Sequence, residues 1–475
     1  MLRSPVGRSA CCLVLAVLAG CVPFRRPAPP QDLPSHWRNA TPGTPVPLVD
    51  LQGWWKAFGD PTLDGLVEQA VAQNLSVAQA SRRLQAARIL AEHGQDAYLP
   101  QLSASAHSSE QVSATDTFYQ VSLDSVWELG LFGEREGKAQ QSQARLAAAG
   151  ADEQAARVAM VAELVRNYLE LRAAQVQVRD LEALGELDRR ALELHEVRVA
   201  SHLDAADQRL QLQAQQARNQ ARLSAPRQIQ ARAEHNLAAL LGRSAPDPAW
   251  SRPGELPSLV AGAPESVPSD LLRTRPDVQR AEAKLLEATG ELGVAKARLY
   301  PRVALGISYL FAYNVTQQEN VGFNGVPMIG PMVDLPLFDW GQRQAMAKAQ
   351  RELVQAALDG YRQTLVGGVA QTEAALAALN QQQSRLKFLL QAADALGQSH
   401  EHQQALSDLG LASEWDLLGS RRERLEQGLQ VSSAQAARDL AFVALYRALG
   451  GAPLPKDAPN APATAPAADS REPRT

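Results

Sequence analysis

The chain has 475 residues, of which 45% are hydrophobic, 21% are charged and only 5% are aromatic. Its formal net charge of −4 excludes a strongly basic nucleic-acid-binding protein. Past the N-terminus, no apolar stretch reaches the roughly 20 residues that a transmembrane helix needs. All three cysteines lie in the first 21 residues, so the rest of the chain has none for a disulfide.

The N-terminus has the pattern of a secretory signal, with two arginines before a short apolar run at residues 10–18. The run ends in Leu18-Ala19-Gly20-Cys21, which resembles the box of bacterial lipoproteins that are cut before the cysteine and acylated on its thiol. We expect residues 1–20 to be removed and Cys21 to carry the lipid, whose buried methylenes each contribute about 0.8 kcal/mol. The alternative is a signal without lipid and an incidental cysteine.

A first structural unit is predicted over residues 54–243. Residues 21–53 are rich in proline and lack periodicity, as expected of a tether. The unit contains a predicted helix over 61–97, a β-hairpin over 101–128 where apolar and polar residues alternate, and a helical hairpin. Its long arm runs from about 138 to 199 and its returning arm from about 205 to 241.

The same order of elements is predicted again over residues 269–451. A Pro/Gly-rich linker at 244–268 comes first, expected at mid-height of the long helices, and a tail at 452–475 with a disordered composition comes last. The repeat holds a helix over 269–299, strands within 302–337, and a long helix to about 409 with its return. Landmarks pair at separations near 200 residues: Pro100 with Pro301, Phe132 with Phe338, and Leu241-Gly242 with Leu449-Gly450. This period indicates a duplicated domain.

Aromatic residues concentrate in the predicted strands. Half of the 24 aromatic side chains lie in residues 98–132 and 300–340, which resembles the girdles of outer-membrane barrels. Four strands cannot close a barrel, whereas three copies would supply twelve and leave an open lumen. The alternatives are an ordinary β-subdomain core and a coiled-coil protein without a pore.

Several motifs then identify a family by resemblance. They are Leu271-Leu272-Arg273-Thr274-Arg275-Pro276-Asp277-Val278 with Ala281-Glu282 and Gly293, Trp54-Trp55 with Phe58 and Asp60-Pro61, Pro336-Leu337-Phe338-Asp339, and Leu445-Tyr446-Arg447-Ala448-Leu449-Gly450-Gly451. Together they resemble the TolC-like outer-membrane efflux lipoproteins, the exit ducts of resistance-nodulation-division pumps. The resemblance implies a mainly α fold with a small β part: a homotrimer whose 12-stranded β-barrel in the outer membrane continues into a periplasmic α-helical barrel.

The resemblance also implies a function. The chain is expected to be a passive, gated duct that works with a periplasmic adaptor protein and an inner-membrane proton-driven transporter, with no cofactor. A duct for type I protein secretion and a non-conducting periplasmic coiled-coil lipoprotein are the alternatives. The tips of the helical hairpins are expected to contact the adaptor: Val199, Ala200, Ser201, His202, Leu411, Ala412, Ser413 and Glu414.

Charged residues near these tips are candidates for an ionic gate, or for ordinary solvated helix surface. They are Arg198, Asp204, Asp207, Asp408, Asp416, Arg421 and Arg422. Many relatives have Asp after the paired leucines of the second tip, but here Leu417-Leu418 is followed by Gly419. Asp416 or Asp408 is the expected substitute.

Signals for catalysis or metal binding are weak. His400 and His402 are two residues apart on a predicted helix and therefore do not share a face. Ser201, His202 and Asp204 are triad residue types within a single turn, which rarely gives triad geometry. We therefore expect neither an enzyme nor a metal site.

Overall fold

The computed structural model describes residues 37–39, 51–110, 117–203, 208–259, 274–314 and 327–453. The chain divides into two compact units, which we describe separately. The sheet unit comprises residues 80–152 and 277–367, and the coil unit comprises residues 34–79, 153–276 and the chain from 368 onward. Cys21, Asp204 and Asp207 lie outside the described residues.

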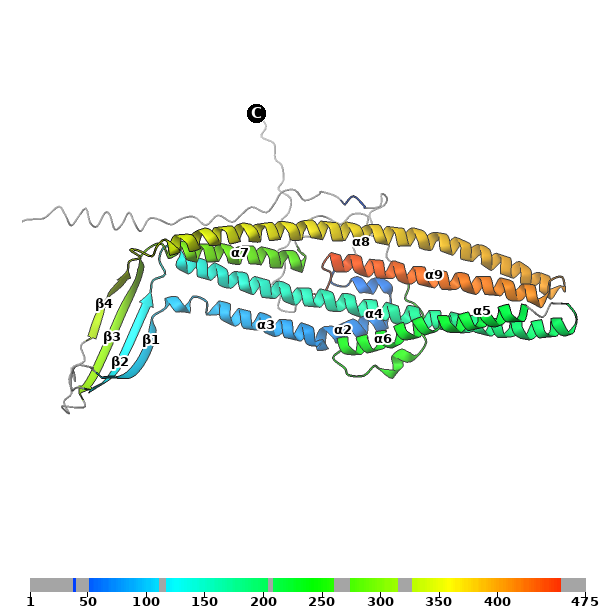
Figure 1. The fold of residues 1–475 in the computed structure, drawn as a ribbon, viewed down its shortest axis with the longest axis horizontal. Helices are drawn as coiled ribbons and strands as arrows, with labels where there is room; N and C mark the ends of the chain where they lie inside the picture. The colour runs from blue at the N-terminus through cyan, green and yellow to red at the C-terminus, as the bar shows by residue number, and fades with distance from the viewer. Residues whose placement is uncertain are drawn as a thin grey trace, which may run out of the picture. The chain divides into compact units, whose positions relative to one another are not determined.

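The elements follow the predicted order and are labelled in Figure 1. The helices are α2 (Pro61–Gln73), α3 (Leu75–Glu92), α4 (Glu134–Ala200), α5 (Gln208–Arg222), α6 (Ser224–Leu240), α7 (Pro276–Ala297), α8 (Gln342–Asp408) and α9 (Glu414–Ala448). The strands are β1 (Gln101–Glu110), β2 (Thr117–Glu128), β3 (Arg302–Asn314) and β4 (Pro327–Asp334), and 3-10 turns lie at Trp54–Phe58, Asp96–Tyr98 and Pro248–Ser251. Within the described ranges, none of the helices combines the length and apolarity needed to cross a membrane.

Two predicted helices are each interrupted. The predicted helix over 61–97 breaks at Asn74, whose buried side chain accepts a hydrogen bond from Val77 N (3.0 Å) and donates one to Leu240 O (2.8 Å). The side chain thereby caps α3 and ties it to the end of α6. The predicted return over 205–241 breaks at Leu223, between α5 and α6. Both long helices are confirmed, and each has 67 residues, close to 100 Å at 1.5 Å per residue.

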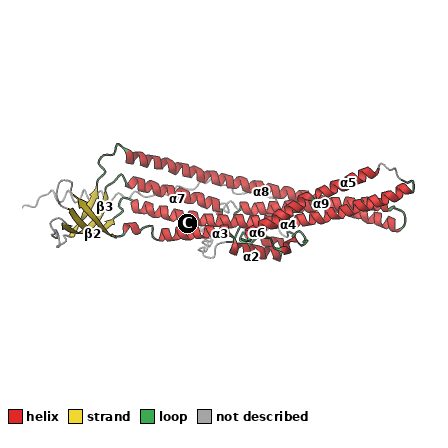
Figure 2. Cartoon of the chain, turned by 60° about the horizontal axis from the view of Figure 1, so that its bottom comes forward, coloured by secondary structure: helices red, strands yellow, loops and turns green. Residues whose placement is uncertain are grey.

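The four strands form one antiparallel sheet in the order β1-β2-β3-β4. The hairpins β1-β2 and β3-β4 are local, whereas β2 pairs with β3 across the two repeats, with Leu123 opposite Tyr309. The sheet is drawn in yellow in Figure 2. Its two outer strands, β1 and β4, each have one edge without a partner strand among the described residues.

The helices of the sheet unit follow the same order as the strands, α3-α4-α7-α8 (Figure 1). An added Cβ on Gly150 of α4 would meet Leu84 of α3 at 4.0 Å. Gln140 of α4 donates to Thr289 Oγ1 of α7 (2.7 Å), and Gln350 of α8 donates to Glu291 Oε2 of α7 (2.7 Å). The faces of α3 and α8 that point away from this row have no helix against them among the described residues of the unit.

In the coil unit, the family motifs meet in one aromatic core. Trp54 stacks on Tyr446 (5.6 Å between centroids, 17° between planes), and its indole N–H donates to Gly451 O (3.1 Å). Phe442 packs against Trp54 (6.2 Å) and Phe58 (5.6 Å). These contacts attach the N-terminal turn to the C-terminal end of α9 and explain why both ends carry motif residues.

The arginine of the Leu271–Val278 motif is buried beside this core. Arg275 donates to Ala448 O at the end of α9 and to Gln371 Oε1 of α8 (2.8 Å). Gly450, with φ +78°, follows this helix end, and an added Cβ there would lie 3.1 Å from Pro276. A side chain at this position would therefore be strained by the positive φ and would press against the proline that starts α7.

Part of the predicted tether is bound. The main-chain N–H groups of Arg38 and Asn39 donate to the Glu373 carboxylate of α8 (2.6 and 3.0 Å). Asn380 donates to Asn39 O (2.9 Å), and Trp37 is buried. These described tether residues are thus held on α8 instead of being free.

The backbone corrects one of the paired landmarks. Phe132 and Gly133 have φ of +60° and +87° just before α4, and Trp340 and Gly341 have φ of +57° and +81° just before α8. Phe132 therefore corresponds to Trp340 and not to Phe338, because five residues (335–339) separate β4 from the positive-φ pair in the second repeat, whereas three (129–131) separate β2 from it in the first. With this correction, β4 and α8 each follow their counterparts β2 and α4 by 208 residues.

Candidate functional site

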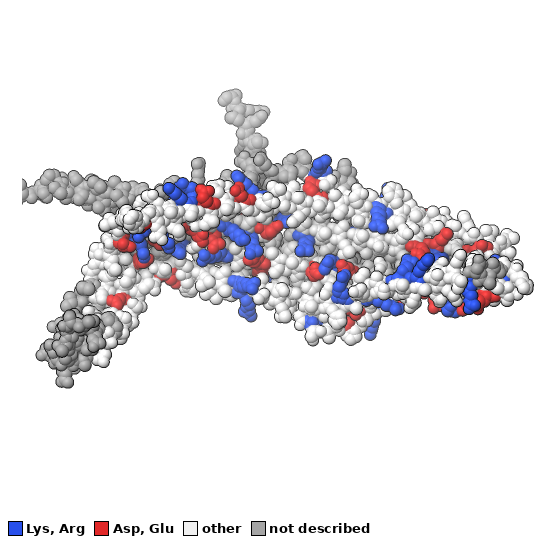
Figure 3. Space-filling view, in the orientation of Figure 1, with Lys and Arg blue, Asp and Glu red and all other residues white. Residues whose placement is uncertain are grey.

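One face of the sheet is apolar and exposed. Directly opposed residues of an antiparallel pair share a face, and the pairs Tyr119–Tyr313, Val121–Phe311 and Leu123–Tyr309 all lie on this one. Trp127, Ile307, Ile329 and Val333 extend the face, and all of these side chains except Tyr309 are large exposed hydrophobics. One view of the sheet shows almost no charged side chain in its described part (Figure 3). This face requires an apolar environment.

The opposite face carries a hydrogen-bonded polar network, beside the exposed apolar side chains of Val126, Leu310 and Met332. Ser308 Oγ donates to Asp124 Oδ1 (2.6 Å), and Ser122 Oγ donates to Asp124 Oδ2 (2.5 Å). Ser105 Oγ lies 2.8 Å from Ser122 Oγ, so the network joins β1, β2 and β3. The polar network is confined to this face, whereas the Tyr119–Tyr313 face is apolar, and such a difference between faces suits a sheet with lipid on one side and water on the other.

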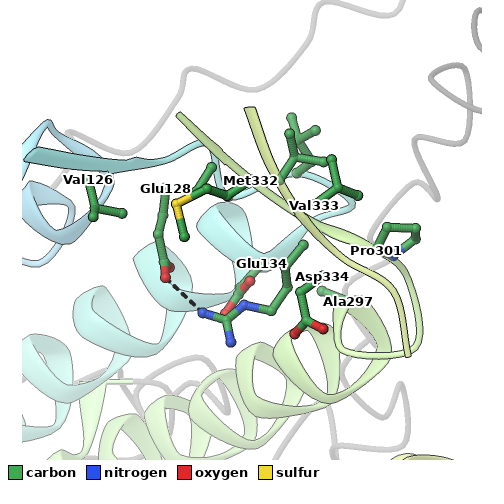
Figure 4. A pocket seen from close by; sticks show the side chains of 13 residues that line it. Val126, Glu128, Glu134, Ala297, Pro301, Met332, Val333 and Asp334 are labelled. Carbon is green, nitrogen blue, oxygen red and sulfur yellow. Dashed lines mark hydrogen bonds and ion pairs between the residues drawn. The ribbon is translucent and has the colours of Figure 1, made fainter. Parts of the chain in front are cut away.

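The polar face ends in a charged hollow. A cavity of about 350 Å³ lies where the strands meet the end of α7 and the start of α4 (Figure 4). Arg302 donates to Glu128 (2.7 Å) across β2 and β3, and Glu134 and Asp334 also line the cavity. An excess of carboxylates over this arginine makes the lining acidic.

The predicted tip residues occupy the turns that end both long helices. Val199 and Ala200 close α4, and Ser201 and His202 form the following turn, where His202 has φ +56°. Leu411 and Ala412 form the second turn, and the Leu411 side chain is exposed. Charged side chains of both signs gather near this end of the coil unit (Figure 3).

Asp416 has a local structural role. Ser413 is the N-cap of α9: its hydroxyl accepts from Asp416 N (3.2 Å), while Ser413 N donates to Asp416 Oδ2 (3.1 Å). This capping box holds the pKa of Asp416 below its ordinary value, mainly through the Ser413 hydroxyl, with a smaller contribution from Arg198. Arg198 itself lies over the Trp415 ring (5.7 Å), and Glu414 pairs with Arg190 of α4 (2.7 Å).

A second charge network crosses three helices farther from the tips. Arg422 of α9 donates to Asp188 of α4, whose side chain is only 1% exposed and also accepts from Gln215 of α5 (2.9 Å). Glu426 accepts two hydrogen bonds from Arg222 of α5 (2.8 and 3.0 Å), which hold the pKa of Glu426 below its ordinary value. Arg422 also lies 3.8 Å from Glu426.

Of the gate candidates in the described part of the chain, Arg422 is the one that the structure pairs with a buried carboxylate, that of Asp188. Asp408 accepts from Gln404 of the same helix (2.9 Å), and Arg421 is exposed. The sequence analysis missed Asp188, Glu426 and Arg222. Asp188 lies at a helical spacing from Leu181 and Leu184, on the buried side of α4. An acidic residue at a position where this spacing predicts a buried leucine could have marked Asp188 as a functional candidate.

No metal site is formed by the part of the chain that the structure describes: no group of three or more His, Cys, Asp or Glu side chains is placed to hold an ion. His400 Nδ1 lies 2.9 Å from Ser420 Oγ. Burial, with Arg424 and Arg421 nearby, lowers the pKa of His400.

Comparison with known proteins decides the family. The family described as "Outer membrane efflux protein" matches residues 66–243 and 267–451. The chain belongs to this family. The two matched segments together cover most of the chain and separate at the Pro/Gly-rich linker.

Curated and solved relatives agree with this assignment. Nodulation protein T of Rhizobium leguminosarum biovar trifolii is 27% identical over 441 residues, which cover 89% of this chain and 91% of that protein. The outer membrane protein OprJ of Pseudomonas aeruginosa is 27% identical and covers 95% and 97%. The solved outer-membrane channel OprN superposes with a TM-score of 0.79 at 29% identity, covering 92% of this chain and all of OprN.

The chain is therefore an outer-membrane efflux channel that extends into the periplasm of a Gram-negative bacterium. Its fold class is the one predicted, that of the trimeric TolC-like channels with their duplicated unit of long helices and a β-hairpin. Its family is one of channels rather than enzymes.

Proposed function

We propose that three copies of this chain form a passive, gated export duct. The observation that carries the proposal is the two-faced sheet with two unpaired edges. Twelve strands would close it into a barrel with the aromatic face toward lipid and the Asp124 network toward a water-filled lumen. Closure also satisfies the edge hydrogen bonds of β1 and β4, which cannot be left open in lipid.

The duct works within a tripartite assembly with a periplasmic adaptor and an inner-membrane transporter that supplies the energy. Support comes from relatives at 25% identity in Pseudomonas putida, whose names are "Antibiotic efflux pump outer membrane protein ArpC" and "Toluene efflux pump outer membrane protein TtgC". The adaptor meets the two tips, 199–202 and 411–414, where short turns expose small and polar side chains.

The gate uses the charge network behind the tips, in which the Asp188 carboxylate is buried and its partners are partly exposed. Arg422, Asp188, Glu426 and Arg222 join α9 to α4 and α5, so the second helical hairpin cannot move away from the first without stranding the Asp188 charge. Breaking a buried ion pair costs about 3–5 kcal/mol, and this cost is what holds the helices closed at rest.

A lipid on Cys21 anchors the mature chain to the same membrane. The support is the Leu18–Cys21 box at the end of the signal-like segment. Intact-mass analysis of the purified protein should give a chain starting at Cys21 with acyl mass attached, and a chain with a free Cys21 thiol would contradict the anchor.

The duct is tested by single-channel recording of the full chain in a planar bilayer. Purified protein should run as a trimer, and the Arg422→Gln variant should give discrete openings much more often than the unmodified chain. A trimer that never conducts, with or without Arg422→Gln, would overturn the proposed duct in favour of a structural lipoprotein.

A further inference from the structure

The cavity where the strands meet the helices, which we call the junction cavity, is built from both repeats. Its volume is about 350 Å³, within the range of about 300–1,000 Å³ that is usual for small-molecule sites. Its walls come from the ends of β2 and β4, the start of β3, the end of α7 and the start of α4 (Figure 4). All of these elements belong to the sheet unit, so a single chain forms the cavity.

Packing behind one wall fixes the shape of the junction cavity. Gly130 lines this wall with φ +57°, and an added Cβ there would lie 2.6 Å from the Tyr98 ring. Tyr98 is itself buried, and its carbonyl oxygen accepts a hydrogen bond from the Trp127 indole (2.9 Å). A side chain at position 130 would be strained by the positive φ and would meet this ring. The wall is therefore held by packing, which gives a ligand a preformed surface.

Acidic groups line one end of the junction cavity. Figure 4 shows the carboxyl groups of Glu128, Glu134 and Asp334 close together there. Arg302, the one basic residue among the described residues that line the cavity, donates to Glu128 (2.7 Å). Glu134 and Asp334 form no ion pair and no side-chain hydrogen bond with any described residue. Their two carboxylates are therefore available to a positively charged ligand.

Two further arginines line a separate, smaller cavity beside this one. The smaller cavity has a volume of about 250 Å³, shares three charged residues with the junction cavity and adds Arg298 and Arg343. Arg343 lies 3.8 Å from Asp339, and neither arginine forms an ion pair with Glu134 or Asp334 in the described ranges. The lining of the junction cavity itself keeps two more acidic than basic residues.

The other end of the junction cavity is apolar. Val126, Met332 and Val333 lie at this end in Figure 4, and Leu131 also lines the cavity. In the part of the chain that the structure describes, acidic side chains are nowhere grouped closely enough to hold a metal ion. Spaced carboxylates at one end and apolar side chains at the other suit a larger cation, whose charge is carried on an apolar body.

We propose that the junction cavity binds an amphipathic organic cation. Its charged group, a quaternary ammonium or a protonated amine, lies at Glu134 and Asp334, and its hydrocarbon body lies against Val126 and Met332. The cavity opens on the face of the sheet that carries the Asp124 network. The role of this site rests on the proposed duct, in which that face meets the exported solute, and the site retains cationic amphiphiles on their way through.

Binding is measured with benzyltrimethylammonium, by saturation-transfer NMR on the purified full chain in detergent. Tetramethylammonium has the charge without the ring, and benzyl alcohol has the ring without the charge. Both should bind more weakly than benzyltrimethylammonium, because each uses only one end of the cavity. Added salt should weaken the binding of both cations and leave that of benzyl alcohol unchanged, since salt screens partly exposed charges.

Variants of the lining locate the site. Glu134→Gln and Asp334→Asn should each weaken benzyltrimethylammonium binding about threefold, and together about tenfold, as expected for partly solvated charges. Ala304→Phe places a ring in the cavity without altering charge and should abolish binding. The control is Glu136→Gln, which removes the same charge from the same first turn of α4 outside the lining and should leave the dissociation constant unchanged.

Failure of the site and failure of the duct give different results, because one chain forms the cavity. In single-channel recordings, benzyltrimethylammonium should block the unmodified and Glu136→Gln channels at concentrations that leave the Glu134→Gln, Asp334→Asn double variant open. A conducting channel that does not bind the cation, or binds it equally in all of these variants, would overturn the site and leave the duct standing. Variant-sensitive binding in detergent without any conductance would overturn the duct and leave the site standing.

Discussion

Among the charged residues near the tips, Arg422 has the contacts that favour an ionic gate over an ordinary solvated helix surface. It is 26% exposed and pairs with Asp188, whose side chain is 1% exposed and whose Oδ2 has no hydrogen-bond partner among the described residues. Arg227 and Glu182 form an ion pair of α6 with α4 in which both side chains are about half exposed. The two pairs have the same chemistry and differ in desolvation, which makes them a natural comparison.

Arg422→Gln should raise the open probability of the reconstituted channel several-fold and lower its thermal stability, because it leaves Asp188 charged and buried with only Gln215 as a partner. Adding Asp188→Asn should restore much of the stability while the channel stays open more often. Open probability is measured by single-channel recording and stability by thermal unfolding in detergent.

Arg227→Gln is the control for this prediction and should change neither property appreciably, since exposed ion pairs contribute about 0–1 kcal/mol. An Arg422→Gln channel that gates like the Arg227→Gln channel would remove the charge network from the gate. Asp416→Ala is a less informative variant than the sequence alone implies, because it also removes the capping box of α9.

Among the elements, α9 carries a carboxyl group on the face that packs into the aromatic core. Asp439 is fully buried, three residues before Phe442, and Arg438 donates two hydrogen bonds to its Oδ1 (2.8 and 2.6 Å). Burial raises the pKa of Asp439 to about 6, in spite of Arg438. The folded chain thus holds a proton between pH 4 and 6 that the unfolded chain has released, so stability falls as the pH rises through this window.

Asp439→Asn should therefore leave the melting temperature nearly unchanged at pH 4 and raise it at pH 7, where removing the buried charge is worth at most about 3 kcal/mol. Asparagine retains the Oδ1 acceptor for Arg438. Thermal unfolding in detergent at the two pH values measures the effect, and an equal shift at both would contradict it.

Asp416→Asn serves as a comparison of opposite sign. The pKa of Asp416 is lowered by the Ser413 hydrogen bonds, so its stabilising contribution is present at neutral pH and is lost as the pH falls through the lowered pKa. This variant should be less stable than the unmodified chain at pH 7, with a smaller difference at low pH.

The elements also show where sequence reasoning succeeds. The alternation at residues 101–128 and the helical periodicity up to Leu241-Gly242 and Leu449-Gly450 depend on interactions between residues close in the sequence. The strands and helix ends could therefore be predicted from the sequence. The break at Asn74 was missed because its side chain bonds to Leu240 O, 166 residues away. Trp340 was missed as the partner of Phe132 because residue type pointed to Phe338, whereas the equivalence lies in the backbone φ.

The candidate site was less predictable for the same reason. The sequence predicts gate residues from their nearness to the tips along the chain. The structure distinguishes Arg422 from its neighbour Arg421 because Arg422 pairs with the buried Asp188, whereas Arg421 is exposed. Asp188 lies 234 residues before its partner Arg422, and Arg222 lies 204 residues before its partner Glu426. Only the packing of three helices brings these pairs together.

For the whole molecule, the polar face of the sheet sets the electrostatics of the duct. Asp124, Glu128 and Asp334 outnumber Arg302 on this face and at its base, so a lumen lined by three copies is acidic. An acidic pore concentrates cations and should favour their passage over that of anions.

Asp124→Asn should reduce this preference and move the reversal potential in a KCl gradient toward zero, with little change in conductance. Ser122→Ala removes a neighbouring hydrogen bond of the same network without altering charge, and should leave the reversal potential unchanged. A reversal potential insensitive to Asp124→Asn would place the Asp124 face away from the ion path.

The pairing of β2 with β3 has a consequence for how the molecule is made. The β1-β2 hairpin closes from neighbouring residues, but Phe118 meets Asn314, close to 200 positions away, only after α4, α5, α6 and α7 have been synthesised. Pairings between distant residues form slowly. Each newly exported chain must therefore cross an aqueous compartment with its aromatic strands uncovered, in a state prone to aggregation. We therefore expect the rate at which the strands pair and insert into the membrane, rather than the stability of the finished duct, to limit how much channel is assembled.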